Sequence, residues 1–255
     1  MVLFFITAIV IVAQTITGCD HSKKTKGTVT INLPQKKNDP VWIGKDFSQI
    51  PINTDSGKLI FYGYKLIVNT AFYLGPKGIV AFASNGMNCE NCHLNGGTKP
   101  FGNNFGKVFS NYPKYRNRNG SMQTIYDRIN DCFVRSLNGK ELDSSTHEMQ
   151  AIYAYIKWLG EEVPKGVSPE GTTFINVKYL DRPANPIAGK QVFTMQCQSC
   201  HGKNGEGLMN TNGIGYAFPP LWGKNSYNDG AGIYRLGEFA DFVKNNMPYG
   251  TSWQH

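Results

Sequence analysis

The chain has 255 residues, 40% of them hydrophobic, which is enough for one large domain or two ordinary ones, each with its own core. Its formal net charge of +8 comes from lysine and arginine residues that are scattered and form no long basic run, a pattern that argues against nucleic-acid binding. Only Lys23, Lys24 and Lys26 cluster. We therefore expect two domains and a residual positive charge that can attract small anions.

The N-terminal residues are typical of a secretory signal rather than of a membrane span. An apolar run from Val2 onward is followed by small and polar residues up to Cys19. Residues 16–19, ITGC, resemble a bacterial lipobox, in which the cysteine is lipidated and becomes the first residue of the mature protein. The alternative is an ordinary signal cut nearby, with Cys19 incidental. We expect a signal peptide at 1–19, a flexible polar tether at 20–40, and a periplasmic protein anchored to a membrane through lipidated Cys19.

Four of the six cysteines fall in two C-x-x-C-H pentads, CENCH at residues 89–93 and CQSCH at residues 197–201. In c-type cytochromes two thiols at this spacing attach to one haem, and the histidine that follows ligates its iron. Structural zinc sites also use C-x-x-C pairs, but those pairs usually lie closer in sequence and need no histidine after each. The pentads therefore predict two covalently bound haem c groups. The thioethers would form on Cys89, Cys92, Cys197 and Cys200, and the iron ligands would be His93 and His201.

Helical periodicity predicts three helices in a first domain, residues 41–160. They cover residues 55–75, 121–138 and 145–160. The first helix is expected to be capped by Asp55 or Ser56. The third is expected to begin with a capping box formed by Ser145 and Glu148.

A second domain is expected at residues 187–255, after a linker at 161–186 whose short polar stretches are rich in proline and glycine. Its predicted helices run from Gly189 to His201 and from Leu236 to Asn246, with a Gly-rich loop between them. Neither domain shows sustained strand alternation. The expected fold class is therefore all-α.

The order of helix, C-x-x-C-H motif, loop and helix resembles the class I cytochrome c fold. Residues 218–221, FPPL, resemble the loop that lines the haem edge in that fold. The resemblance implies two class I domains in tandem. The chain stops eight residues after Met247, where a class I domain normally continues into a terminal helix, so the second domain is expected to be truncated at its C-terminus.

A haem iron held by one histidine needs a second axial ligand or stays open to a substrate. In the second domain, Met247 lies at a helix end, 46 residues after His201, which is a normal class I position for a methionine ligand. A methionine there can also be core filler. Met209 competes, but it lies only eight residues after His201 and would have to fold straight back across the haem. We predict Met247 as the ligand.

The first domain has Cys132 in the corresponding place, 39 residues after His93. Most free cysteines are buried, inert thiols, and His147 is another possible ligand. Arg128 and Ser136 lie one turn before and one turn after Cys132, so the three share one stripe of the predicted helix. A guanidinium there would stabilise a thiolate, which is the form that iron or a sulfur electrophile requires.

After residue 41 the chain resembles the dihaem thiosulfate dehydrogenase family, whose members join two thiosulfates into tetrathionate or run the reverse reaction. The likeness is strongest at residues 128–139, RINDCFVRSLNG, and extends to residues 63–78 and 91–95. It implies a substrate site of four residues, Arg118, Arg128, Cys132 and Ser136, with the cysteine as a ligand of the active-site haem. It also implies Met247 as ligand of the second haem. Some members carry a lysine just before this methionine, where this chain has Asn246, so switching to a lysine ligand is not expected.

Thiosulfate is a dianion, so a site that holds two of them needs fixed positive charge, which Arg118 and Arg128 can supply by bidentate contacts. Each arginine alone could instead be a solvated surface charge or a partner for a haem propionate. Thiolate ligation lowers the potential of a haem and His/Met ligation raises it. Electrons are therefore expected to pass from the first haem to the second and on to an external carrier such as another cytochrome. The resulting hypothesis is an oxidoreductase that oxidises thiosulfate to tetrathionate, or catalyses the reverse.

Two alternatives remain open. A dihaem electron carrier without its own substrate would have two coordinately saturated haems and no need for the stripe around Cys132. A sulfur-carrier cytochrome subunit would pass a thiosulfate-derived sulfur to the thiol of a partner protein.

Overall fold

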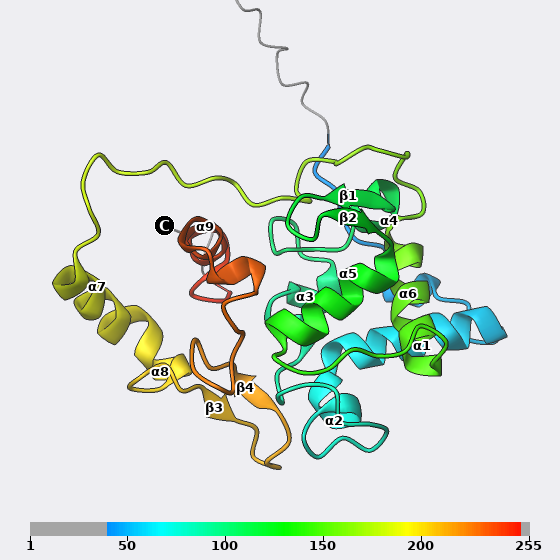
Figure 1. Ribbon diagram of the computed structural model, residues 1–255, viewed down its shortest axis with the longest axis horizontal. Helices are drawn as coiled ribbons and strands as arrows, with labels where there is room; N and C mark the ends of the chain where they lie inside the picture. Colours follow the sequence, from blue (N-terminus) through cyan, green and yellow to red (C-terminus); the bar gives the residue numbers. More distant parts are fainter. Residues whose placement is uncertain (1–39, 251–255) are drawn as a thin grey trace, which may run out of the picture. The chain divides into compact units, whose positions relative to one another are not determined.

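The computed structural model describes residues 40–250 (Figure 1). The predicted signal peptide with Cys19 lies outside the described residues, as does the predicted tether except for Pro40. Within the described part of the chain, no helix is both long enough and apolar enough to span a bilayer.

Two helices packed side by side, α1 (Asp55–Val68) and α6 (His147–Gly160), form the centre of the first domain (Figure 1). The shorter helices of this domain are α2 (Thr70–Leu74), α3 (Leu94–Gly97), α4 (Val108–Asn111) and α5 (Ile125–Asp131). A π-helical turn, Cys132–Ser136, continues α5, and 3-10 turns cover Phe47–Gln49 and Cys89–Asn91.

The predicted cap of the first helix is wrong by one or two residues. The cap is Thr54, whose hydroxyl accepts from the backbone N–H of Gly57 at 3.0 Å. Threonine is a good cap because its side-chain oxygen takes an amide that has no partner inside the helix. The helix also ends earlier than expected, at Val68, and the chain turns at Asn69 before α2 begins.

The predicted capping box of the third helix is also wrong. Thr146 caps α6 by accepting from the backbone N–H of Met149 at 3.3 Å. The Ser145 hydroxyl is held by the carboxylate of Asp143, at 2.5 Å. Glu148 accepts from the Tyr62 hydroxyl on α1 at 3.0 Å, so a contact between helices replaces the local one.

The predicted start of the second helix, near residue 121, falls in a strand instead. β2 (Ser121–Gln123) pairs antiparallel with β1 (Lys114–Arg116). The helix begins at Ile125, where Thr124 and Asp127 form a capping box with bonds of 3.2 and 2.8 Å. A capping box of this kind stabilises the start of a helix, because it gives a partner to the backbone N–H groups of both Thr124 and Asp127.

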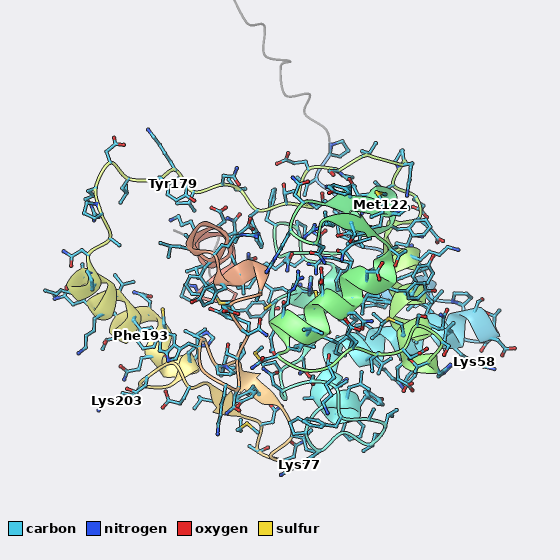
Figure 2. The ribbon with its side chains drawn as sticks, in the orientation of Figure 1. Lys58, Lys77, Met122, Tyr179, Phe193 and Lys203 are labelled. Carbon is cyan, nitrogen blue, oxygen red and sulfur yellow. The ribbon has the colours of Figure 1, made fainter. Side chains whose placement is uncertain are left out.

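The second domain consists of α7 (Pro186–Val192), a π turn (Phe193–Cys197), α8 (Gln198–His201), the hairpin of β3 (Leu208–Met209) and β4 (Tyr216–Phe218), a 3-10 turn (Gly232–Tyr234) and α9 (Leu236–Asn246). The bounds of α9 are those predicted. The helical stretch that leads to His201 begins three residues before the predicted Gly189, because Pro186 occupies its first turn and Asn185 caps it. Every residue of α7 is exposed (Figure 2).

The described chain is mostly helical, which confirms the predicted fold class. Its two small hairpins were not predicted. Residues 161–185 contain neither helix nor strand. Hydrogen bonds nevertheless connect this segment to both domains. The Ser110 hydroxyl donates to the carbonyl of Val167 at 2.8 Å, and the backbone N–H of Val177 donates to Asp241 on α9 at 2.7 Å.

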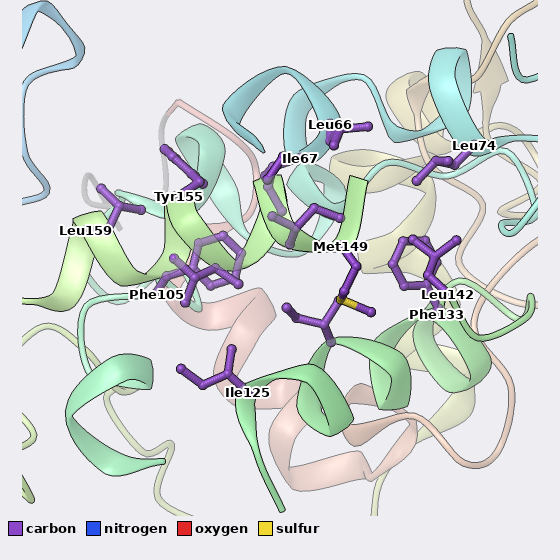
Figure 3. Close-up of a cluster of buried hydrophobic side chains, with 14 of the residues drawn as sticks. Leu66, Ile67, Leu74, Phe105, Ile125, Phe133, Leu142, Met149, Tyr155 and Leu159 are labelled. Carbon is purple, nitrogen blue, oxygen red and sulfur yellow. The ribbon is translucent and has the colours of Figure 1, made fainter. Parts of the chain in front are cut away.

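The core of the first domain lies between α1, α5 and α6 (Figure 3). Leu66, Met149 and Tyr155 are completely buried there, and each such side chain contributes about 1.5 to 3 kcal/mol by leaving water. The Tyr155 hydroxyl donates to the carbonyl of Gly96 at 2.8 Å. The core thereby fixes the loop that carries the first C-x-x-C-H motif.

The contact between α1 and α6 depends on Gly63, where a Cβ atom would collide with the backbone carbonyl of Ala151. We expect Gly63→Ala to lower the free energy of unfolding by about 1 to 3 kcal/mol, the usual cost of overpacking. The measurement is the midpoint of guanidinium chloride unfolding, followed by circular dichroism. The control is Gly189→Ala on α7, where nothing lies within 4 Å of the added carbon and the midpoint should not fall. Equal midpoints for the two variants would contradict this account of the contact.

Candidate functional site

The first C-x-x-C-H motif lies in a loop that is fixed at its start by hydrogen bonds to α2. The backbone N–H of Cys89 donates to the Thr70 hydroxyl at 3.0 Å, and Asn88 accepts from the backbone N–H of Ala71 at 2.8 Å. Thr70 is completely buried, so this end of the loop is part of the core. Two thiols of one pentad are thereby presented from a rigid backbone.

The imidazole of His93 is oriented by the same loop. Its Nδ1 bonds to the carbonyl of Asn103 at 2.5 Å, and its ring stacks on Phe105 with centroids 4.4 Å apart. A carbonyl on Nδ1 leaves Nε2 free to ligate a metal, the usual arrangement for an iron-ligating histidine. Burial lowers the pKa of His93 to about 4, which keeps the ring neutral, as a ligand must be.

Beside this motif is a cavity of about 440 Å³. Its lining includes Cys89, Cys92 and His93 from the pentad, together with Arg128, Cys132 and Ser136. Burial raises the pKa of both pentad thiols to about 12. The remaining walls are largely apolar, so the cavity suits a flat, hydrophobic cofactor bound through the pentad.

Cys132 and Arg128 are in direct contact in this cavity. The Nη1 of Arg128 lies 2.9 Å from the Cys132 sulfur and donates to it. Interaction with the charge of Cys132 raises the pKa of Arg128 above its usual value. The π turn that begins at Cys132 closes with a 2.9 Å bond from the backbone N–H of Leu137, and it keeps Ser136 on the cavity wall. Three of the four predicted substrate residues are therefore together.

Arg118, the fourth predicted substrate residue, lines an adjoining pocket of about 150 Å³. Arg128, Cys132 and Ser136 line this pocket too. The Arg118 guanidinium donates to the carbonyl of Gly230 in the second domain. Other arginines also line this pocket, and the sequence had not indicated them: Arg116, Arg135 and Arg235. No local signal identifies them, because they come from β1, the π turn and the start of α9 and meet only in the folded chain.

His147, the alternative ligand to Cys132, stacks on Tyr62 with ring centroids 5.2 Å apart. It is not among the residues that line the described cavity of the first domain. Its place in the first turn of α6 therefore separates it from His93.

The second motif repeats the orientation of the imidazole. The Nδ1 of His201 bonds to the carbonyl of Pro219 at 2.8 Å, within the FPPL loop. Burial raises the pKa of Cys197. Met247 directly follows α9, and Met209 is half-exposed in β3. The choice of Met247 as iron ligand stays a prediction.

Both motifs thus fit a haem c group: two thiols at thioether spacing and one imidazole whose Nδ1 is held by a backbone carbonyl. In the first domain, Cys132, Arg128 and Ser136 line the cavity beside the motif, and Arg118 lines the adjoining pocket.

Comparison with known proteins agrees with this description. Residues 80–164 match the SoxA/TsdA cytochrome c domain, and residues 187–252 match the cytochrome c family. The "as isolated" structure of the thiosulfate dehydrogenase TsdBA from Marichromatium purpuratum has a TM-score of 0.74 and 27% identity, over 82% of this chain and 45% of that one.

Three curated thiosulfate dehydrogenases are similar in sequence. The Psychrobacter arcticus protein is 43% identical over 166 residues, which is 65% of this chain and 50% of that protein. The Stutzerimonas stutzeri protein is 33% identical over 95% of this chain and 78% of its own length. The Allochromatium vinosum protein is 35% identical over 76% of this chain and 71% of its own length. The chain thus spans half of the first relative and more than two thirds of the other two, and it belongs to the thiosulfate dehydrogenase family of dihaem cytochromes c.

Proposed function

We propose that this protein joins two thiosulfates into tetrathionate, or catalyses the reverse, and exchanges the electrons with an external carrier such as another cytochrome. The observation that carries the proposal is the 2.9 Å contact between Arg128 and Cys132 in a cavity shared with the first C-x-x-C-H motif. When bound, the two haems supply the iron centres that accept the two electrons of the reaction.

Cys132 has two roles in the proposal. With haem attached to the first motif, the resting Cys132 thiolate and His93, which line the same cavity, would hold its iron. In turnover the thiolate bonds to the outer sulfur of one thiosulfate, giving a cysteinyl S-thiosulfonate. This is a two-electron oxidation, and the bound haems would accept its electrons. The outer sulfur of a second thiosulfate then attacks the adduct at the sulfur atom bonded to Cys132, which releases tetrathionate and restores the thiolate. Charge and atoms balance in both steps.

The neighbouring side chains bind the anionic substrates in this proposal. Arg128 donates to Cys132, so its guanidinium is in place to neutralise the sulfonate of a thiosulfate bound there. Arg118 lies in the adjoining pocket, where a second dianion would enter. Ser136 lines both spaces, and its hydroxyl can donate to a sulfonate oxygen.

The pocket favours an enzyme over the two alternatives. An electron carrier without a substrate needs no arginine-lined opening beside an axial ligand. A sulfur carrier would pass its sulfur to a partner thiol, whereas the proposed enzyme yields one tetrathionate from two thiosulfates. A steady-state assay with thiosulfate and ferricyanide, and with tetrathionate and a low-potential donor, separates all three by product.

We expect Cys132→Gly to lower turnover by orders of magnitude, because both sulfur-transfer steps need the thiolate. The signal of a thiolate-ligated low-spin haem in electron paramagnetic resonance should disappear, while haem attachment persists. The control is Val134→Gly, which adds the same backbone freedom to an exposed position of the same π turn. Full turnover of Cys132→Gly would show the proposed mechanism to be wrong.

Met247 is proposed as the ligand of the second haem. Met247→Gly should abolish the weak red absorption of sulfur-to-iron charge transfer in the oxidised protein and lower the potential of that haem, because a thioether favours ferrous iron. Optical spectra and a redox titration measure both effects. Met209→Gly is the matched control and should leave them unchanged. If the control alone removes the absorption, Met209 is the ligand.

We also propose that the protein is exported to the periplasm and held at a membrane by lipidated Cys19. The support is the apolar run followed by ITGC at residues 16–19. Cys19→Ala should move the protein from the membrane fraction to the soluble fraction, because stable anchoring requires more than one acyl chain and none would remain. Ser22→Ala, just beyond the site, is the control in the same fractionation. Equal membrane binding of the two variants would place the anchor elsewhere.

A further inference from the structure

The pocket next to Cys132 is built from both haem domains. Five arginines line it, and four of them belong to the first domain. The fifth, Arg235, directly precedes α9 in the second domain. Figure 2 shows side-chain nitrogens between α5 and α9. The second domain therefore contributes a cation to the place where the substrate is proposed to bind.

The position of Arg235 is set by hydrogen bonds between the domains just before it. The backbone N–H of Asn228 donates to the carbonyl of Arg135 at 3.0 Å, and its side-chain amide donates to the carbonyl of Val134 at 2.9 Å. Asn85 donates to the carbonyl of Ser226 at 2.9 Å. These bonds hold the segment before Arg235 against the π turn that carries Cys132.

The charges in the pocket are not balanced by the protein. Arg135 pairs with Asp131 at 3.2 Å, and Arg235 pairs with Glu238 at 3.3 Å. The second pair is weak, since 59% of the Arg235 side chain and 47% of the Glu238 side chain are exposed. Arg118, Arg135 and Arg235 line the same pocket, and burial, followed by the charges of the other two arginines, lowers the pKa of Arg118. A dianion in the pocket would relieve their mutual repulsion.

We propose that Arg235 is a substrate-binding residue that holds the sulfonate farther from Cys132. This inference rests on the proposed function. Arg128 lines both the cavity and the adjoining pocket and contacts Cys132, so it binds the sulfonate nearer to Cys132. Arg235 lines only the adjoining pocket. The far sulfonate belongs to the second thiosulfate or to the distal end of tetrathionate. On binding, it takes the place of Glu238 beside Arg235.

The first test is steady-state oxidation of thiosulfate by ferricyanide with the holoprotein. Arg235→Gln should raise KM about tenfold with little change in kcat, since a charged hydrogen bond made equally to bound substrate and transition state is lost. Arg235→Lys should recover part of the loss because it restores the charge. Arg182→Gln is the matched control, because it removes the same charge from an exposed position of the linker and should behave like the wild type.

The second test needs no turnover. Tetrathionate is titrated calorimetrically into the fully oxidised holoprotein carrying Cys132→Gly in addition to each variant, because the Cys132 thiolate would otherwise cleave tetrathionate by exchange without external electrons. Arg235→Gln should weaken binding by about the same factor as it raises KM. Glu238→Gln should tighten binding, because it frees Arg235, and this gain should vanish in the double variant Arg235→Gln with Glu238→Gln.

The outcomes separate the two proposals. If Arg235→Gln matches Arg182→Gln in both KM and tetrathionate affinity, Arg235 does not bind substrate, while the wild-type turnover still supports the proposed function. If the wild type has no turnover in either direction, the proposed function is wrong, and the titration still decides whether Arg235 binds a disulfonate.

Discussion

The contact between the Arg128 guanidinium and the Cys132 sulfur gives the first haem cavity its chemical character. It puts a cation 2.9 Å from the group proposed as both iron ligand and nucleophile, on the wall of a cavity that the pentad also lines. Both groups line the cavity, so the sulfur keeps its access to it while in contact with the guanidinium. The rest of the first domain holds the pentad loop and α5 in place around this pair, through the buried Thr70 and Tyr155.

Two of the contacts between the haem domains lie next to residues with a proposed role in binding or ligation. The Asn246 side chain is completely buried, and its amide donates to the carbonyl of Phe101 at 2.9 Å, next to the proposed ligand Met247. The position that carries a lysine in some family members is thus used here for a contact between domains. In the proposed substrate pocket, the Arg118 guanidinium donates to the carbonyl of Gly230, so this pocket also lies between the two domains. The proposed substrate pocket and the segment that ends in Met247 are therefore both in contact with the other domain.

The local differences between predicted and observed elements have two causes. In isolation, Asp55 and Ser145 are at least as good helix caps as Thr54 and Thr146, so local propensity does not identify the cap that the fold selects. Ser121 was assigned to a helix because the strand β2 has only three residues, too few for an alternating pattern to appear. Periodicity over a longer segment was more reliable, and the bounds of α9 were predicted correctly.

The sequence by itself determined the two haem-binding motifs, the helical fold and the stripe of Arg128, Cys132 and Ser136, because each is a property of residues within one turn or one motif. Only the tertiary structure decided which groups surround that stripe. Arg116 and Arg135 come from separate elements of the first domain, and Arg235 comes from the second. The approach of Arg235 follows from hydrogen bonds between residues more than 90 positions apart, such as that between Asn228 and Val134. Such contacts leave no periodic trace in a sequence, because they depend on how whole elements pack.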